Sequence, residues 1–143
     1  MSKVSFEQAV AEAVRVDPRY ATDAYFFLRD ALDTTIKTMQ QGRRDAISHV
    51  SGAELSEGVR QYALQQFGPM VPTIFEAWGL TNTRDLGEMV FNLIRTGAFS
   101  RSDSDKPEDF NDIYNFVDAF EKPFLPVRGT TPGQAPASSQ RKP

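Results

Sequence analysis

The side chains that most often perform chemistry in proteins are scarce in this chain. It holds one histidine, His49, and no cysteine. The lack of cysteine excludes disulfides, thiolate metal sites and thiol nucleophiles, and the phosphate-binding loop and G-x-S-x-G motifs are absent as well. A single histidine needs further groups around it to become catalytic. We therefore predict that His49 packs over the start of the next helix, and that the chain binds no cofactor.

Carboxylates are the remaining candidates for chemistry. The stretch DSDKPEDFND places Asp103, Asp105, Asp109 and Asp112 close together as hard oxygen ligands, but it lacks the central glycine and terminal glutamate of an EF-hand loop. Charge runs of this kind are usually solvated, so we predict no metal site. The adjacent acids Glu108 and Asp109 keep a carboxylate-dependent enzyme open as a second alternative, although absence of catalysis is the favoured prediction.

Charge is unevenly distributed along the chain. The net charge is −3, but residues 127–143 carry three bases and no acid, which leaves 13 bases and 19 acids in residues 1–126. Seven of these acids and one base lie between Asp103 and Glu121. A nucleic-acid-binding domain normally presents a basic surface to phosphates. The acidic body therefore argues against DNA as the partner.

The elements that must position these side chains begin with two predicted helices. Ser5 and Gln8 match a capping box, and the helical apolar spacing that follows ends at Pro18. A second, longer apolar stripe covers residues 21–39. Phe26 lies off that stripe, toward the polar side of the helix.

A third helix is marked at both ends. Ser51 and Glu54 form a second capping-box pattern directly after His49. Apolar residues then recur at helical spacing for about four turns. Gly68 is predicted to end this helix, and Pro69 prevents its continuation.

Two further helices and a less regular segment follow. The first is short, with Trp78 on its apolar face and Gly79 as its C-terminal cap. Thr83 is predicted to cap the next helix, over residues 84–95. Residues 98–116 contain short apolar runs around a polar loop, which predict either a β-hairpin or a loop that leads into a last helix.

This order of elements allows a winged-helix arrangement, in which the helix before the hairpin reads DNA. The outer face of that helix is predicted to carry Arg84, Asp85, Glu88, Asn92 and Arg95, which have no net charge. Acidic side chains facing phosphates weaken binding. A winged-helix-like DNA-binding protein is therefore an alternative, and a solvated helix face explains the same residues.

The favoured hypothesis is a protein-interaction or regulatory module that acts through a protein partner, whose identity is unknown. Large aromatic side chains near arginine are favoured at the centres of interfaces. This makes Phe26, Arg84, Glu88, Phe91 and Arg95 candidate partner contacts. The competing explanation is that both phenylalanines pack inside the domain.

The fold class expected from these patterns is mainly α. Residues 1–126 are predicted to form one helical globular domain, and residues 127–143, which are rich in Pro, Gly, Ser and Thr, a disordered tail. Neither a secretory signal nor a membrane-spanning stretch is visible, so we expect no membrane and a cytoplasmic location.

Several short words occur in one order along the chain: DPRY, AYFFLRDAL, HVSG, QFGP, WG, DLGEMVFNLI and KPFLP. Together they resemble an uncharacterised family of small bacterial proteins found mainly in the planctomycete–verrucomicrobial group. The resemblance covers residues 6–126. It implies no activity, cofactor or catalytic residue.

Overall fold

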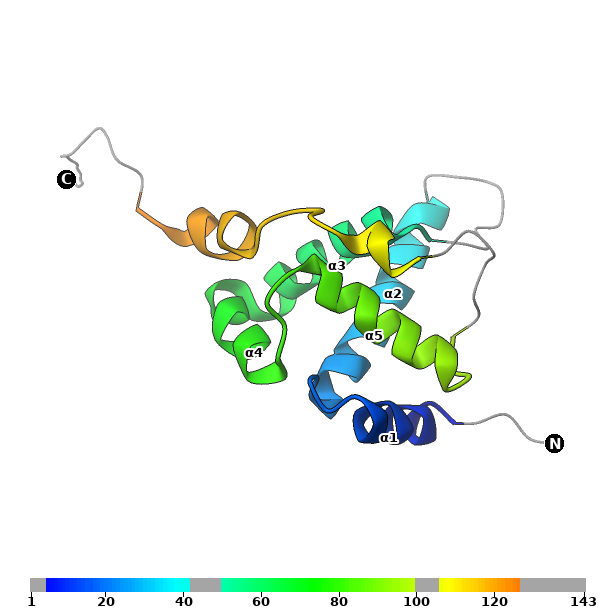
Figure 1. Ribbon diagram of the computed structural model, residues 1–143. Coiled ribbons are helices and arrows are strands. Elements are labelled where there is room, and N and C mark those ends of the chain that lie inside the picture. The colour runs from blue at the N-terminus through cyan, green and yellow to red at the C-terminus, as the bar shows by residue number, and fades with distance from the viewer. Residues whose placement is uncertain (1–4, 42–49, 100–105, 127–143) are drawn as a thin grey trace.

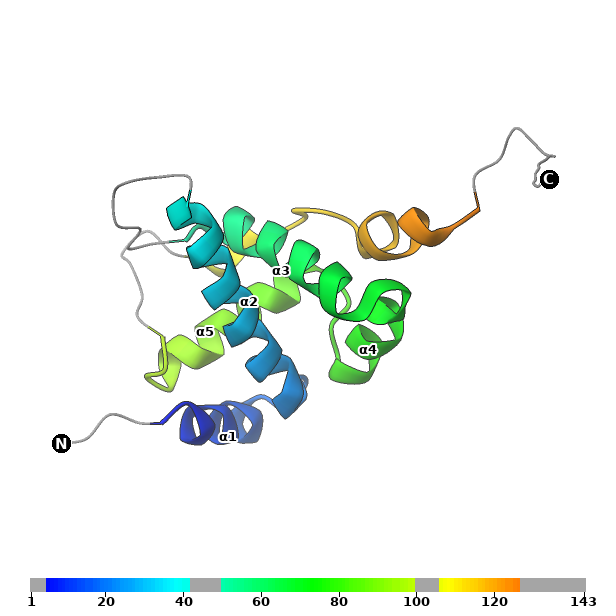
Figure 2. The same ribbon diagram turned by 180° about the vertical axis from the view of Figure 1, so that it is seen from behind.

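The computed structural model describes residues 5–41, 50–99 and 106–126, and these residues fold into helices with no strand among them (Figures 1 and 2). The predicted mainly α fold is thereby confirmed. The elements, in chain order, are α1 (Phe6–Val16), α2 (Thr22–Gln41), α3 (Gly52–Phe67), η1 (Gly68–Met70), α4 (Val71–Trp78), α5 (Thr83–Arg95), η2 (Pro107–Phe110), η3 (Val117–Glu121) and η4 (Lys122–Phe124).

Two of the predicted helix starts are confirmed in atomic detail. The Ser5 hydroxyl accepts a hydrogen bond from the Gln8 amide at 3.1 Å, and the Gln8 side-chain oxygen accepts one from the Ser5 amide. Ser51 and Glu54 form the same reciprocal pair at the start of α3, at 3.0 and 2.9 Å. Each box satisfies two backbone N–H groups that the helix cannot.

The cap of α5 lies one residue before the predicted position. Asn82 and Asp85 form its capping box. Thr83 is instead a buried residue whose hydroxyl donates to the Phe110 carbonyl at 2.6 Å and accepts from the Ile113 amide at 3.1 Å. Thr83 therefore anchors the segment after α5 rather than the helix itself.

Glycines end α3 and α4 as predicted. Gly68 has a φ of 52°, and Pro69 follows within η1. Gly79 has a φ of 87°, and a Cβ atom there would lie 2.1 Å from the Arg19 carbonyl oxygen. Gly79 is thus required both for its left-handed backbone and for the close approach of the turn between α1 and α2.

The core is formed by side chains from α1 to α5 and from the C-terminal segment. Its largest fully buried members include Tyr20, Tyr25, Phe75 and Phe120. Trp78 is partly buried and lies among Phe27, Phe67 and Phe75, with ring centroids 5.3 to 6.0 Å away. This packing supports its predicted structural role.

Residues after α5 form helical turns instead of the hairpin. Residues 98–99 and 106–116 contain no strand. Pro107 opens η2, and Phe110 packs directly on α5, where a Cβ on Gly87 would lie 2.7 Å from its ring. Phe116 and Phe120, four residues apart, both reach Phe75 at 5.6 and 5.3 Å between centroids. This spacing places both rings on one side of the helical turn that the segment forms.

The winged-helix arrangement loses its wing among the described residues, which contain no strand. Helix α5 contacts α1, α3 and η2, and Figure 1 shows it crossing in front of α2. None of the helices described is long and apolar enough to cross a membrane. His49, Asp103, Asp105 and the predicted tail lie outside the described residues.

Candidate functional site

Three of the predicted partner contacts engage other residues of the chain. Arg84 Nε donates to Glu88 Oε2 at 2.8 Å, and Arg84 Nη1 donates to Asn111 Oδ1 at 3.1 Å. Glu88 also accepts from Arg19 at 3.4 Å. The remaining arginine, Arg95, donates to the side-chain oxygen of Asn92. Arg84 and Glu88 therefore join α5 to its surroundings, whereas the hydrogen bond of Arg95 lies within α5.

The structure brings the turn between α1 and α2 against α5 through a polar junction, formed by Asp17, Arg19, Tyr20, Asp85 and Asn92. Asp17 accepts two hydrogen bonds from the Arg19 guanidinium, at 2.8 and 2.7 Å, and one from Asn92 at 3.0 Å. These bonds, led by those of Arg19, hold the pKa of Asp17 well below its usual range. Asp17 is therefore ionised at neutral pH.

Tyr20 closes the other side of the polar junction. Its hydroxyl donates to Asp85 Oδ1 at 2.6 Å. Burial and this bond raise the pKa of Tyr20 far above its usual value. Asp85 Oδ2 also accepts from the amide and the hydroxyl of Thr81, at 2.8 and 2.9 Å. Asp17 and Tyr20 of the DPRY stretch therefore hold the turn between α1 and α2 against α5.

Asn92 was assigned to the outer face of its helix from sequence, and that assignment was wrong. The residue is only 2% exposed. Its amide group donates to Asp17 and to the Tyr25 hydroxyl, both at 3.0 Å. A buried amide is tolerated when its hydrogen bonds are made inside the protein. Asp17 of the DPRY turn supplies one acceptor, and Tyr25 of α2 supplies the other.

The two phenylalanines proposed as partner contacts pack within the domain. Phe91 is 8% exposed. Phe26 is partly buried against Phe6, with ring centroids 5.2 Å apart and the Arg29 guanidinium over both rings. Their contacts match the competing explanation given by the sequence, in which aromatic side chains cover other parts of the chain.

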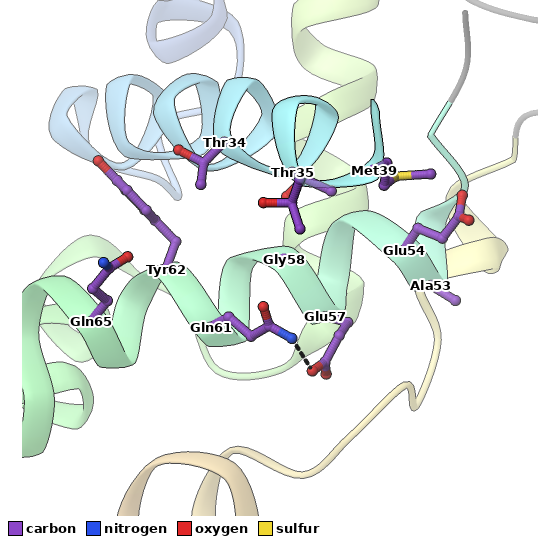
Figure 3. A pocket seen from close by; sticks show the side chains of 11 residues that line it. Thr34, Thr35, Met39, Ala53, Glu54, Glu57, Gly58, Gln61, Tyr62 and Gln65 are labelled. Atoms are coloured by element: carbon purple, nitrogen blue, oxygen red, sulfur yellow. Dashed lines mark hydrogen bonds between the residues drawn. The ribbon is translucent and has the colours of Figure 1, made fainter. Parts of the chain in front are cut away.

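A groove of about 470 Å³ runs between α2 and α3 (Figure 3). Its floor is made of small residues, and a Cβ on Gly58 would lie 1.8 Å from Thr35 Oγ1, so the helices touch closely there. Thr35 donates to the Ala31 carbonyl at 2.7 Å. Glu57 accepts from Arg60 at 2.8 Å and from Gln61 at 2.9 Å, and the first of these lowers its pKa. These polar groups already have partners.

A second groove, of about 390 Å³, lies between α4 and η3. We name it the α4–η3 groove. Its apolar lining comes from both sides of the groove, and its polar lining consists of Thr81, Glu76 and Glu121. The full set is Pro72, Phe75, Glu76, Leu80, Thr81, Phe116, Val117, Phe120 and Glu121.

Large apolar side chains are exposed beside this groove. Val117 is 45% exposed, Phe124 48%, Leu125 60% and Met70 53%. Met70 belongs to η1, which contacts η3, and η4 continues directly from η3. We call these four residues the C-terminal apolar surface. Both views show the segment that bears three of them at the end of the molecule where α4 lies (Figures 1 and 2).

The sequence contained a signal for this surface that was not used. In EKPFLP, two adjacent large apolar residues stand between prolines. Because prolines stand on both sides, Phe124 and Leu125 cannot be part of a long amphipathic helix. Without such a helix, fewer arrangements of the chain would bury them in the core. In the sequence, KPFLP served only as one word of the family resemblance, at the end of the predicted domain.

Within the three described ranges, no group of three or more His, Cys, Asp or Glu residues is arranged to hold a metal ion. Asp109 Oδ2 accepts the Lys106 amide at 3.1 Å, and Asp112 has a φ of 51°. No family model, curated protein or solved structure matches this chain. The comparisons therefore leave the resemblance to the small bacterial family untested.

Proposed function

We propose that this protein is an interaction module that binds a protein partner through the C-terminal apolar surface. The observation that carries the proposal is the exposure of Met70, Val117, Phe124 and Leu125 at one end of the fold. Contiguous exposed apolar side chains on a water-soluble domain mark interaction sites. This surface replaces Phe26, Phe91 and the charged residues of α5 as the proposed contact.

The rest of the described surface has few exposed large apolar residues, which supports the choice of the C-terminal apolar surface as the binding site. Of the large apolar residues that are well exposed, only Val16, on α1, lies outside the C-terminal apolar surface. Single exposed apolar residues are normal and need no explanation. Four of them on consecutive or contacting elements are a different case, because their joint burial by a partner would remove a continuous apolar area from water.

The alternatives have less support. DNA binding would need cations free to meet phosphates, whereas Arg84 donates to Glu88 and Asn111, and Arg95 donates to Asn92. A carboxylate-dependent enzyme would need paired acids in a cleft with shifted pKa values. Asp17, whose pKa is strongly shifted, is held in the polar junction by Arg19 and Asn92. A cytoplasmic location and the bacterial family remain proposals from sequence.

The test uses tagged full-length protein in lysate of the source organism, with nuclease present. We expect one protein to be recovered with the wild type and lost with the double variant Phe124→Ser and Leu125→Ser. Val16→Ser is the matched control, because it removes an exposed apolar side chain from α1. Equal recovery with the double variant would contradict the proposal, and so would salt-sensitive retention on duplex DNA in place of a protein.

A further inference from the structure

We infer that the α4–η3 groove receives an apolar side chain of the partner protein from a segment flanked by lysine or arginine. This inference rests on the proposed function and adds the chemistry of the partner to it. The groove adjoins the C-terminal apolar surface through Val117, which belongs to both. A partner segment could thus cover the exposed residues and enter the groove at once.

The walls of the groove explain the apolar part of the inference. Phe75 and Leu80 are buried residues of the α4 side, and Phe120 is a buried residue of η3. Their rings and methyl groups belong to the core, so the groove has a firm apolar base. A side chain seated there would lose its apolar contact with water, which is the main favourable contribution at interface centres.

The charge of the groove is the reason for proposing lysine or arginine on either side of the partner's apolar side chain. Its only charged lining residues are Glu76 and Glu121, from α4 and η3 respectively. Both are exposed, and neither takes part in an ion pair within the described residues. The nearest pair on η3 and η4 is Asp118 with Lys122, at 2.7 Å, which uses that lysine.

The segment that surrounds the groove is also negatively charged. Residues 106–126 carry five acids and two bases, a net charge of −3. An acidic surface draws a basic partner toward it and disfavours an acidic one. Apolar contact without this charge pattern would accept any hydrophobic segment, whereas the two carboxylates favour one with lysine or arginine at its edges.

The experiment titrates full-length protein with synthetic peptides and follows the amide shifts and the fluorescence of Trp78, which packs on Phe75 at 6.0 Å between centroids. One peptide has a Leu-Phe-Leu centre between lysine flanks. The second keeps the centre and has glutamate flanks. The third keeps the lysines and has a serine centre. We expect only the first to bind measurably, with shifts at α4 and η3.

Glu76→Gln together with Glu121→Gln should weaken binding of the first peptide by roughly three- to ten-fold, because two exposed ion pairs are lost. The double variant should also reduce the salt dependence of binding. Both substitutions are isosteric and at exposed positions, so the fold should be retained. Glu7→Gln, an exposed position on α1, is the matched control and should leave affinity unchanged.

Equal binding of the lysine- and glutamate-flanked peptides, or an unchanged affinity of the double glutamine variant, would overturn the basic-partner inference. A third outcome concerns residues 127–143, which carry Arg128, Arg141 and Lys142 and no acid. If changing these three to glutamine in the full chain raises peptide affinity more than ten-fold, the chain's own tail is the occupant, and the partner assignment is wrong.

The two proposals fail in distinguishable ways. Loss of recovery with Phe124→Ser and Leu125→Ser, combined with no peptide preference for lysine, would retain the interaction surface and reject the groove chemistry. Recovery that does not depend on Phe124 and Leu125 would reject the interaction surface itself, whatever the peptides show.

Discussion

The polar junction and the C-terminal segment both attach non-neighbouring parts of the chain to the core, but by opposite means. At the polar junction, Asp17 accepts directional hydrogen bonds from both Arg19 and Asn92. In the C-terminal segment, Phe116 and Phe120 attach through ring contacts with Phe75. The polar groups of the first region bond to one another, and the second leaves large apolar groups exposed.

This difference separates structural from interacting residues. Charged and amide groups first suggested a contact surface on α5, yet their hydrogen bonds are made within the fold. The apolar residues Val117, Phe124 and Leu125 lie beside a well-packed segment and are exposed themselves. A hydrogen-bonded charge is thus weak evidence for a binding site here, whereas an exposed apolar side chain next to firm packing is stronger evidence.

The largest expected effect tests whether the C-terminal segment is part of the fold. Phe120 is 1% exposed and contacts Phe75, Tyr114 and Phe116. Phe120→Ala should therefore lower the free energy of unfolding by about 3–5 kcal/mol, as for other buried phenylalanines. Urea denaturation measures this, with the exposed Phe124→Ala as the control. A loss below about 1 kcal/mol would mean that the segment is not docked.

The next effect tests the polar junction. Asn92→Ala removes the donor to Asp17 and to the Tyr25 hydroxyl, and leaves their buried oxygens with one partner fewer. We expect a loss of about 1–3 kcal/mol in the free energy of unfolding. Asn111→Ala, at an exposed position that accepts from Arg84, should stay within about 0.5 kcal/mol. Equal losses of stability for the two variants would contradict the structural role given to Asn92.

Acid should weaken the polar junction. The pKa of Asp17 is lower in the folded than in the unfolded protein, so its contribution to stability is present above the unfolded pKa of about 3.9 and is lost as pH falls toward the folded value. Stability of the wild type should therefore fall more steeply below about pH 4 than that of Asp17→Asn. Thermal unfolding from pH 7 to pH 2 measures the difference, and parallel curves would contradict the assignment.

The smallest expected effect sharpens the contrast between packing and exposure. Phe124→Ser and Leu125→Ser should each change the free energy of unfolding by less than about 0.5 kcal/mol, because both side chains are about half exposed or more. The same changes should abolish partner recovery. Chemical denaturation measures the first result. A loss of several kcal/mol would assign these residues to the fold and remove them from the binding surface.

The parts of the fold that depend on neighbouring residues could be predicted from sequence. Ser5 with Gln8, Ser51 with Glu54, and the glycines at 68 and 79 act within three or four residues of a helix end, so their patterns are visible in the chain itself.

The errors concern residues whose environment is set by distant segments. Asn92 faces away from the apolar stripe of its own helix, yet the α1–α2 turn, 75 residues earlier, covers it. Phe91 is also buried, because α5 contacts three other elements, α1, α3 and η2. The hairpin was one of two alternatives for residues 98–116, because the period of their short apolar runs is ambiguous. In the structure, Phe116 and Phe120 belong to helical turns and pack on Phe75.

The late position of the C-terminal segment has a consequence for synthesis. Phe75 leaves the ribosome before the two rings that cover it, and translation proceeds at about 5–20 residues per second. For an interval on the order of seconds, the nascent chain therefore carries an aromatic surface that nothing from its own sequence can yet cover. We expect chaperones that bind apolar surfaces of nascent chains to associate with the chain in that interval and to leave once Phe116 and Phe120 have emerged and packed.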